Sequence, residues 1–597
     1  MKSVALCCRF PEVLLAALPL LAALPLLVAL PLSLALPVWA DTESVSCTLR
    51  LSGGWVVDGS GEPGFQGDVI LDGERIVAAI DRADPRGTAW GNGLRCAHTR
   101  DVRGLVVAPG FINMLSWATE SILLDPRALS DVAQGVTLEV MGEGRSMGPF
   151  VNPQRANLRA SAIDAGVAPQ WRTLGDYFGM LRQAGIGVNV ASYVGATTIR
   201  EYVMGRKTRG PNESELAKMR SLVRQAMEEG AMGVGSSLIY TPANYATTDE
   251  LAALAAEAAQ HGGGYISHLR SESQHLLDAV EELIEISERS GARAEIYHLK
   301  AAGNANWSKL NQVIDAITTA RSRGLEISAN MYPYTAAASG LDAAMPPWVQ
   351  LGGVDLWVER LKDPQVRQKV VAQMRDPHPD WENLLLDGAD KARLLGVKTK
   401  ALRRYVGMTL AEIAAARGVS PEDAAIDLVI ADRSKTRIAY SVMSEANLRK
   451  KLQLEWVSIG SDASAPAAEG RFLYQSQHPR AYGSFARVLG RYVRDEAVLE
   501  LEDAVYQITG LPAANLGLTD RGRIAPGYFA DLAVFDAGKI IDTSTFAESH
   551  SYAKGVQHVY VNGQPVIADG KPTGALPGQI VRGPGWKGSV QTAISQR

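Results

Sequence analysis

The sequence predicts an α/β protein, a (β/α)8 TIM-like barrel with a small β-sandwich domain built from both chain ends. Three observations favour this architecture. From about residue 180, amphipathic helices alternate with short apolar strands at roughly thirty residues per unit, which indicates parallel strands joined by crossover helices. Several such units in succession favour a closed barrel over an open sheet. At both ends of the chain, helical periodicity is missing, and apolar and polar residues alternate as they do in strands.

The first forty residues are predicted to be a secretory signal peptide. An uncharged apolar run covers residues 13–40, and small side chains precede Asp41 at the positions that a signal peptidase reads. We therefore expect cleavage after Ala40, a periplasmic or secreted protein, and no stable membrane insertion afterwards. An uncleaved membrane anchor is the alternative, because the run is long enough to span a bilayer.

Residues 41–108 and 521–597 are predicted to form the two parts of the β-sandwich. Stretches such as "GDVILDGERIVAAI" and "VQHVYVNGQPVIADGK" alternate and contain the Asp-Gly and Asn-Gly turns of hairpins. Cys47 and Cys96 lie in separate predicted strands of the first part. Two cysteines in an exported protein predict one disulfide bond, and two buried thiols are the alternative.

Residues 109–520 are predicted to form the barrel. Segments such as "TTDELAALAAEAAQHGGG" begin with a capping residue and end at glycine, as helices do. Residues 341–445 interrupt the rhythm and are rich in charge, so we expect a helical insertion in one barrel loop.

The composition excludes one class of partner. The chain has 597 residues, of which 21% are charged, and a net charge of −4. It carries no basic patch or charged tail, so we expect no nucleic-acid partner. The sequence leaves an oligomer possible.

Two histidines occupy equivalent places, His268 in "YISHLR" and His298 in "IYHLK". Each ends a predicted strand, and catalytic residues of barrels lie at these C-terminal ends. Imidazole is a usual zinc ligand, although a single strand-end histidine is more often structural. Glu143 follows another apolar strand and can complete the set on zinc. Glu139 in the same strand is its competitor.

Further polar residues follow predicted strands. Asp462 in "VSIGSDAS" is predicted to be the general base, with an Asx-turn or helix cap as the alternative. Lys300 leaves the same side of its strand as His298. Tyr332, Ser339 and Arg480 also fall near strand ends or loops. A cation pair with hydroxyl donors suits a substrate carboxylate, although each of these residues alone could serve packing.

Nine motifs together carry a resemblance to a known family: "GGWVVDGSGEPGF", "GLVVAPGFI", "GVTLEVMGEG", "SHLRSES", "HLKAAG", "YPYTA", "GSDAS", "HPRAYGSFARVLGRYVRDE" and "GRIAPGYFADLAVFD". The chain resembles the amidohydrolase superfamily, specifically its N-acyl-D-amino-acid deacylases (D-aminoacylases), over nearly all of its length after residue 40. The resemblance implies a (β/α)8 barrel with a β-sandwich from both ends. It also implies metal binding by His268 and His298, catalysis by Asp462, and substrate-carboxylate binding by Lys300, Tyr332, Ser339 and Arg480.

The chain departs from the family pattern at two places. Leu115-Ser116-Trp117 stands where the family has a His-x-His pair, and "GEGR" stands where it has a metal-ligand cysteine. In the family the cysteine and the two later histidines hold the tight metal, and the early pair serves a weaker second site. We therefore expect one Zn²⁺ per chain, with Glu143 in place of the cysteine. Leu115 and Trp117 are expected to line the vacated space as an apolar wall.

The sequence thus predicts an exported metal-dependent amidohydrolase that cleaves the amide bond of an N-acyl amino acid or small peptide with zinc-activated water. Its partner would be that small-molecule substrate. The alternatives are a cyclic-amide or lactone hydrolase on the same fold, and a metal-free binding protein that has lost catalysis.

Overall fold

The computed structural model describes residues 46–151, 170–377 and 381–588. The predicted signal peptide and its cleavage position lie outside these residues. Within the described residues, no helix has both the length and the apolar character needed to cross a membrane.

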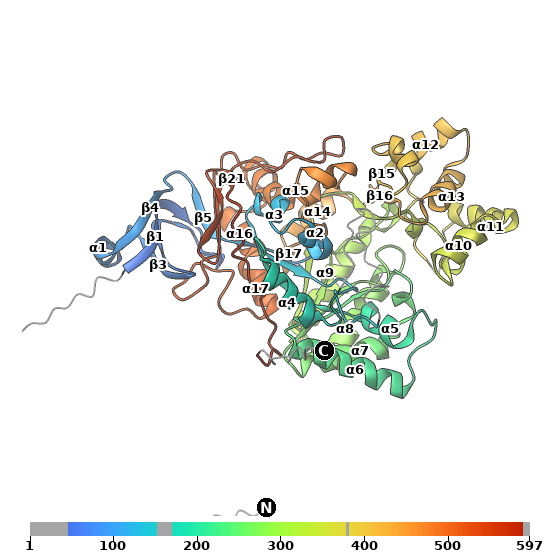
Figure 1. Cartoon of the computed structure of the whole chain (residues 1–597), viewed down its shortest axis with the longest axis horizontal. Helices are drawn as coiled ribbons and strands as arrows, with labels where there is room; N and C mark the ends of the chain where they lie inside the picture. Colours follow the sequence, from blue (N-terminus) through green and yellow to red (C-terminus); the bar gives the residue numbers. More distant parts are fainter. Residues whose placement is uncertain (1–45, 152–169, 378–380, 589–597) are drawn as a thin grey trace, which may run out of the picture. The chain divides into compact units, whose positions relative to one another are not determined.

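The described strands from both chain ends form one nine-stranded sheet (Figure 1). Strand β5 from the N-terminal segment pairs antiparallel with β18 from the C-terminal segment, so the two ends join there. Strand β1 pairs with β2 on one side, and with β4 and then β5 on the other. The strands are β1 (Ser46–Val56), β2 (Phe65–Asp72), β3 (Arg75–Asp81), β4 (Arg95–Asp101), β5 (Val106–Pro109), β18 (Leu532–Phe535), β19 (Val556–Val561), β20 (Gln564–Ala568) and β21 (Lys571–Pro572).

The structure confirms the predicted disulfide between Cys47 and Cys96. The two residues lie opposite each other where β1 pairs with β4, and their Cα atoms are 4.3 Å apart. Cys47 is buried in a small apolar cluster with Ile70 and Ile80. The bridge therefore ties the edge strand β4 to the centre of the β-domain.

The barrel has eight parallel strand positions in the described chain, with β8 and β9 as two parts of one interrupted strand. At the ends of β6 and β17, Met114 N donates to Ile459 O at 3.3 Å and Asp462 N donates to Leu115 O at 2.8 Å, which closes the ring. The strands are β6 (Phe111–Asn113), β7 (Val136–Met141), β8 (Asn189–Ser192), β9 (Val194–Gly195), β10 (Gly233–Ser237), β11 (Gly264–His268), β12 (Ala294–Ile296), β13 (Ile327–Met331) and β17 (Val457–Ile459). The predicted (β/α)8 barrel is confirmed.

The crossover helices begin where the sequence offers caps. Thr173 and Asn212 form capping boxes, and Thr247 accepts the backbone N–H of Glu250. The described helices beside the barrel strands are α2 (Ala118–Leu124), α3 (Leu129–Val132), α4 (Leu174–Ala184), α5 (Ala196–Met204), α6 (Glu213–Glu228), α7 (Thr248–Ala259), α8 (Leu276–Ser290), α9 (Leu310–Ser322), α15 (Arg480–Arg487), α16 (Leu501–Ile508) and α17 (Gly510–Leu516).

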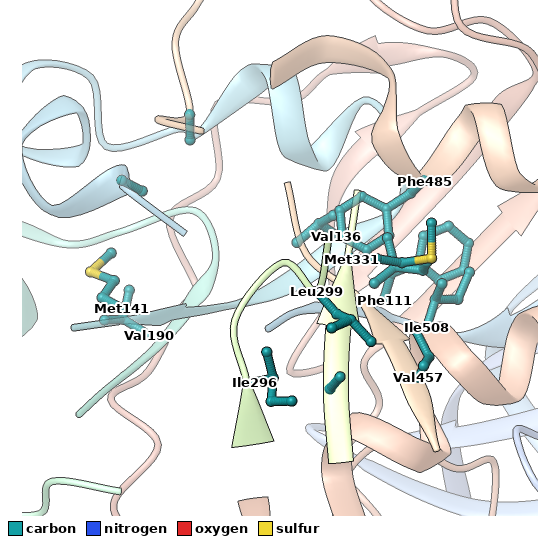
Figure 2. Close-up of a cluster of buried hydrophobic side chains, with 14 of the residues drawn as sticks. Phe111, Val136, Met141, Val190, Ile296, Leu299, Met331, Val457, Phe485 and Ile508 are labelled. Atoms are coloured by element: carbon teal, nitrogen blue, oxygen red, sulfur yellow. The ribbon is translucent and has the colours of Figure 1, made fainter. Parts of the chain in front are cut away.

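Strand and helix side chains meet in one large apolar cluster. Figure 2 shows Phe111 and Phe485 side by side, with Met331, Val457 and Ile508 around them. The rings of Phe111 and Phe485 stack with their centroids 6.1 Å apart. Burial of each such side chain contributes about 1.5–3 kcal/mol, so the barrel supplies a rigid support for the loops at its strand ends.

The insertion between β13 and β17 has a core of its own. It contains helices and, among its described residues, a three-stranded antiparallel sheet, which we did not predict. These strands are short and uneven in polarity, so they lack a clear two-residue period. The elements are β14 (Ala337–Gly340), α10 (Val354–Leu361), α11 (Pro364–Arg375), β15 (Ala392–Gly396), α12 (Leu410–Arg417), α13 (Pro421–Asp432), β16 (Arg437–Tyr440) and α14 (Glu445–Leu452).

Candidate metal centre and active site

A cavity of about 360 Å³ lies at the C-terminal ends of the barrel strands. Loops after several strands line it, and the insertion contributes Ser339, Trp357 and Arg437 to its wall. This is the face on which barrels carry their active sites. All eight residues that we predicted for the site line this cavity: Glu143, His268, His298, Lys300, Tyr332, Ser339, Asp462 and Arg480.

Three of these residues form a candidate metal site. His268 is the last residue of β11, His298 follows β12 by two residues, and Glu143 follows β7 by two. One ligand atom from each lies within 4.8 Å of the other two, and all three side chains are buried. Two imidazoles and a carboxylate are the donor set of many catalytic zinc sites, so the residues present fit this metal.

The second nitrogen of each imidazole is also engaged. His268 Nδ1 lies 3.1 Å from the carbonyl oxygen of Leu269, and His298 Nδ1 lies 3.0 Å from Oε1 of Glu272. Contacts of this kind fix the ring orientation of metal-ligating histidines. We did not predict Glu272 as part of the site. It follows His268 by four residues in "SHLRSES", and only its buried contacts distinguish it from a surface glutamate.

The two imidazoles have different electrostatic surroundings. Burial lowers the pKa of His268 to about 4. Burial and the Lys300 ammonium also lower the pKa of His298, but the carboxylates of Glu272 and Glu143 outweigh them and raise it to about 9. The pKa of Glu272 is held well below its usual range, because Lys300 and both imidazoles outweigh the effect of burial. Glu272 is therefore ionised beside the two imidazoles and the Lys300 ammonium.

Backbone strain marks two of the site residues. His298 and Asp462 adopt left-handed φ values of 37° and 48°, which are unusual for residues other than glycine. The backbone N–H of His298 donates to Asn330 Oδ1 at 2.7 Å, and Asn330 Nδ2 donates to Glu295 Oε1 at 2.7 Å. Such strained residues persist where the surroundings hold them, and they cluster at active sites.

Asp462 lies beside the candidate metal ligands. Its Oδ2 lies 2.9 Å from Arg480 Nη1, and its Oδ1 accepts the indole N–H of Trp117 at 3.1 Å. Burial raises the pKa of Asp462, and the guanidinium of Arg480 opposes that rise. Arg480 is itself buried and lies over the ring of Tyr332, with its guanidinium carbon 4.5 Å from the ring centre. The aspartate is thus held in place by an ion pair with Arg480 and a hydrogen bond from Trp117.

The other predicted substrate residues differ in their availability. Lys300 Nζ lies 2.6 Å from Glu272 Oε1 and 2.5 Å from His298 Nδ1, so its ammonium group already has partners within the protein. Ser339 Oγ lies 3.0 Å from the hydroxyl of Tyr240. The Tyr332 hydroxyl is buried and has no hydrogen-bond partner within the described ranges.

The expectation that Leu115 and Trp117 line the vacated space as an apolar wall is wrong for Leu115 and holds only in part for Trp117. Leu115 is buried in the barrel core and does not line the cavity, because the chain after β6 turns it toward Gly460. Trp117 does line the cavity, but its indole N–H donates to Glu143 Oε2 at 2.8 Å as well as to Asp462. Glu139, the competitor of Glu143, is buried below the cavity, where it accepts a hydrogen bond from Asn113.

Comparison with known proteins gives the family of this chain. Residues 457–567 match the profile of the Amidohydrolase family. The chain is 33% identical to the D-aminoacylase of Alcaligenes xylosoxydans xylosoxydans over 546 residues, which cover 91% of this chain and 99% of that protein. The chain belongs to the D-aminoacylase family of amidohydrolases.

Two solved structures of this family have the same fold. One is a D-aminoacylase studied for its binuclear metal centre, with 31% identity, a TM-score of 0.73 and coverage of 89% of this chain and 99% of that one. The other is the N-acyl-D-glutamate deacylase of Bordetella bronchiseptica in complex with zinc and a phosphonate inhibitor, with 28% identity, a TM-score of 0.72 and coverage of 90% and 100%. The chain therefore has the architecture of a metal-dependent amide hydrolase.

Proposed function

We propose that this protein is a zinc-dependent amidohydrolase that releases the acyl group from an N-acyl-D-amino acid. One observation carries the proposal: Glu143, His268 and His298 converge in a cavity that also contains Asp462, in a chain of the D-aminoacylase family. The D configuration is proposed because the similar proteins act on N-acyl-D-amino acids.

Glu143, His268 and His298 would hold the metal. When bound there, a zinc ion would supply Lewis-acid polarisation of the amide carbonyl and a lowered pKa for a water molecule. Three protein ligands would leave a position for water, as catalytic zinc sites require.

Asp462 would act as the general base. It would take a proton from the attacking water and return it to the leaving nitrogen, which lets the amine depart as a neutral group. Arg480 and Trp117 hold its two carboxylate oxygens. The carboxylate therefore faces the candidate ligands in a fixed orientation, and the reaction needs no rearrangement of it.

The carboxylate of the amino acid would bind next to Tyr332 and Arg480. The Tyr332 hydroxyl is a buried donor without a partner in the described part of the chain, which would make an unliganded site unfavourable. Arg480 lies against the same ring and supplies a positive charge. These two residues support a substrate with a negative group beside the scissile amide.

A substrate panel tests this function. N-acetyl-D-amino acids and their L enantiomers are incubated with the zinc-loaded protein, and the released amine is measured. We expect turnover of D substrates with a free carboxylate and little turnover of amidated forms. A protein that hydrolyses hydantoins or lactones but none of the acyl amino acids would contradict the proposal and favour the alternative of a cyclic-amide or lactone hydrolase.

We further propose that the protein is exported, on the basis of the apolar run over residues 13–40 and the small residues before Asp41. Mass spectrometry of the protein from a periplasmic or secreted fraction checks the mature N-terminus. We expect Asp41 to come first. A chain that keeps Met1 in a membrane fraction would support the anchor instead.

A further inference from the structure

Trp117 stands at the junction that closes the barrel. Its backbone N–H donates to the carbonyl oxygen of Ala463 at 2.9 Å, next to Asp462. The neighbouring Ser116 forms a parallel bridge with Ala463. The loop after β6 is therefore joined to the loop after β17, and these backbone contacts hold Trp117 beside Asp462.

The indole N–H of Trp117 lies between two carboxylates. It donates to Glu143 Oε2 at 2.8 Å and to Asp462 Oδ1 at 3.1 Å. The other oxygen of Glu143 lies 3.1 Å from His298 Nε2, and the other oxygen of Asp462 lies 2.9 Å from Arg480. The indole N–H is thus hydrogen-bonded to one oxygen of each carboxylate. The other oxygen of Glu143, Oε1, lies toward His298.

Two buried carboxylates this close repel each other unless a donor or a cation lies between them. The indole N–H supplies the donor, and the ring fills the space beside it. We propose that Trp117 is a positioning residue that replaces a second metal ion: it orients Glu143 and Asp462 and restricts the site to one cation. This inference rests on the proposed function for its kinetic consequence, but not for its effect on metal binding.

Two substitutions separate the N–H from the ring. Trp117→Phe removes the donor and keeps most of the volume, whereas Trp117→Ala removes both. Trp348→Phe is the matched control, because it also removes an indole N–H with an acceptor at 2.7 Å, Gln373 in the insertion. Thermal unfolding monitored by circular dichroism checks that each variant is folded.

The first readout is the number of Zn²⁺ ions bound by the metal-stripped protein, titrated against a chromogenic chelator. We expect one ion for the wild type, Trp117→Phe and Trp348→Phe. Trp117→Ala is expected to bind a second, weaker ion, because Glu143 Oε2 and Asp462 Oδ1, which the indole N–H contacts in the wild type, then face an open space. Two ions on the wild type would overturn the proposal, and so would one ion on a folded Trp117→Ala.

The second readout is steady-state kinetics at one zinc equivalent. We expect Trp117→Phe to lower kcat by about 10- to 100-fold, as substitution of outer-shell partners does, with KM little changed. A Trp117→Phe enzyme with the wild-type kcat would overturn the positioning role. If no acyl amino acid is hydrolysed even by the wild type, the proposed function fails, while the ion counts still decide whether Trp117 excludes a second cation.

Discussion

His298 Nε2 lies 3.1 Å from Glu143 Oε1, although 155 residues separate them in the chain. The contact joins the loop after β12 to the loop after β7 at the C-terminal face of the barrel. An imidazole nitrogen and a carboxylate oxygen at this distance, with His268 beside them, form a donor set for a divalent cation.

Glu143→Ala is expected to lower zinc occupancy sharply, because the site then keeps only its two imidazoles and loses its carboxylate ligand. Elemental analysis of the purified variant measures this. Glu139→Gln is the control, since Glu139 lies in the same segment but outside the candidate metal site. Full occupancy in Glu143→Ala together with loss in Glu139→Gln would assign the ligand to Glu139 instead.

Asp462→Asn is expected to retain the metal and to lose turnover by about 10²–10⁴-fold, the usual contribution of a general base. The amide keeps the size of the side chain, and its oxygen can still accept the Trp117 N–H. Metal content and kcat are measured on the same preparation. An Asp462→Asn protein that turns over at the wild-type rate would show that another group takes the proton.

Arg480→Ala is expected to reduce both stability and activity at low pH. Removal of one partner from this buried ion pair costs about 3–5 kcal/mol. The guanidinium lowers the pKa of Asp462, so its removal raises that pKa and protonates the base over a wider acidic range. The acidic limb of the kcat profile should therefore move to higher pH. An unmoved limb would argue against a proton-accepting role for Asp462.

Glu295→Gln is expected to stabilise the protein at alkaline pH relative to the wild type. Burial raises the pKa of Glu295 from 4.5 to about 7. Below pH 4.5 the carboxyl is protonated in both states; between 4.5 and 7 the unfolded chain releases its proton first, so stability falls as pH rises. Above pH 7, ionisation of Glu295 therefore lowers the free energy of unfolding by about 3 kcal/mol relative to its value below pH 4.5.

Chemical unfolding at pH 5 and pH 8 measures this linkage. The wild type should lose more stability than Glu295→Gln between the two values. Glu285→Gln serves as the control, because Glu285 is an exposed carboxylate on α8. Equal losses in the wild type and Glu295→Gln would mean that Glu295 titrates at its ordinary pKa in the folded protein.

The sequence predicted the barrel because helix and strand periods differ and are repeated over many residues. It predicted His268, His298 and Asp462 for a related reason: in a parallel barrel, residues at the ends of different strands share one face. The strands of the insertion were missed, since β14, β15 and β16 are four or five residues long and lack a regular alternation.

The contacts within the site could not be predicted from periodicity. Trp117 was expected to form an apolar wall, but its N–H meets Asp462, which lies 345 residues further along the chain. Glu272 follows His268 by four residues in a loop, and only folding places it against His298 and Lys300. Strand order gives the face on which a side chain lies, whereas hydrogen-bond partners depend on loop conformation.

We propose that this chain holds a single divalent ion at Glu143, His268 and His298. Elemental analysis of the purified wild-type protein, before and after dialysis against a chelator, tests it most directly. We expect close to one zinc ion per chain, loss of activity when the ion is removed, and recovery when one equivalent is returned. A protein that binds no divalent ion at any pH, or whose activity survives complete removal of metal, would show that Glu143, His268 and His298 do not form a catalytic metal site.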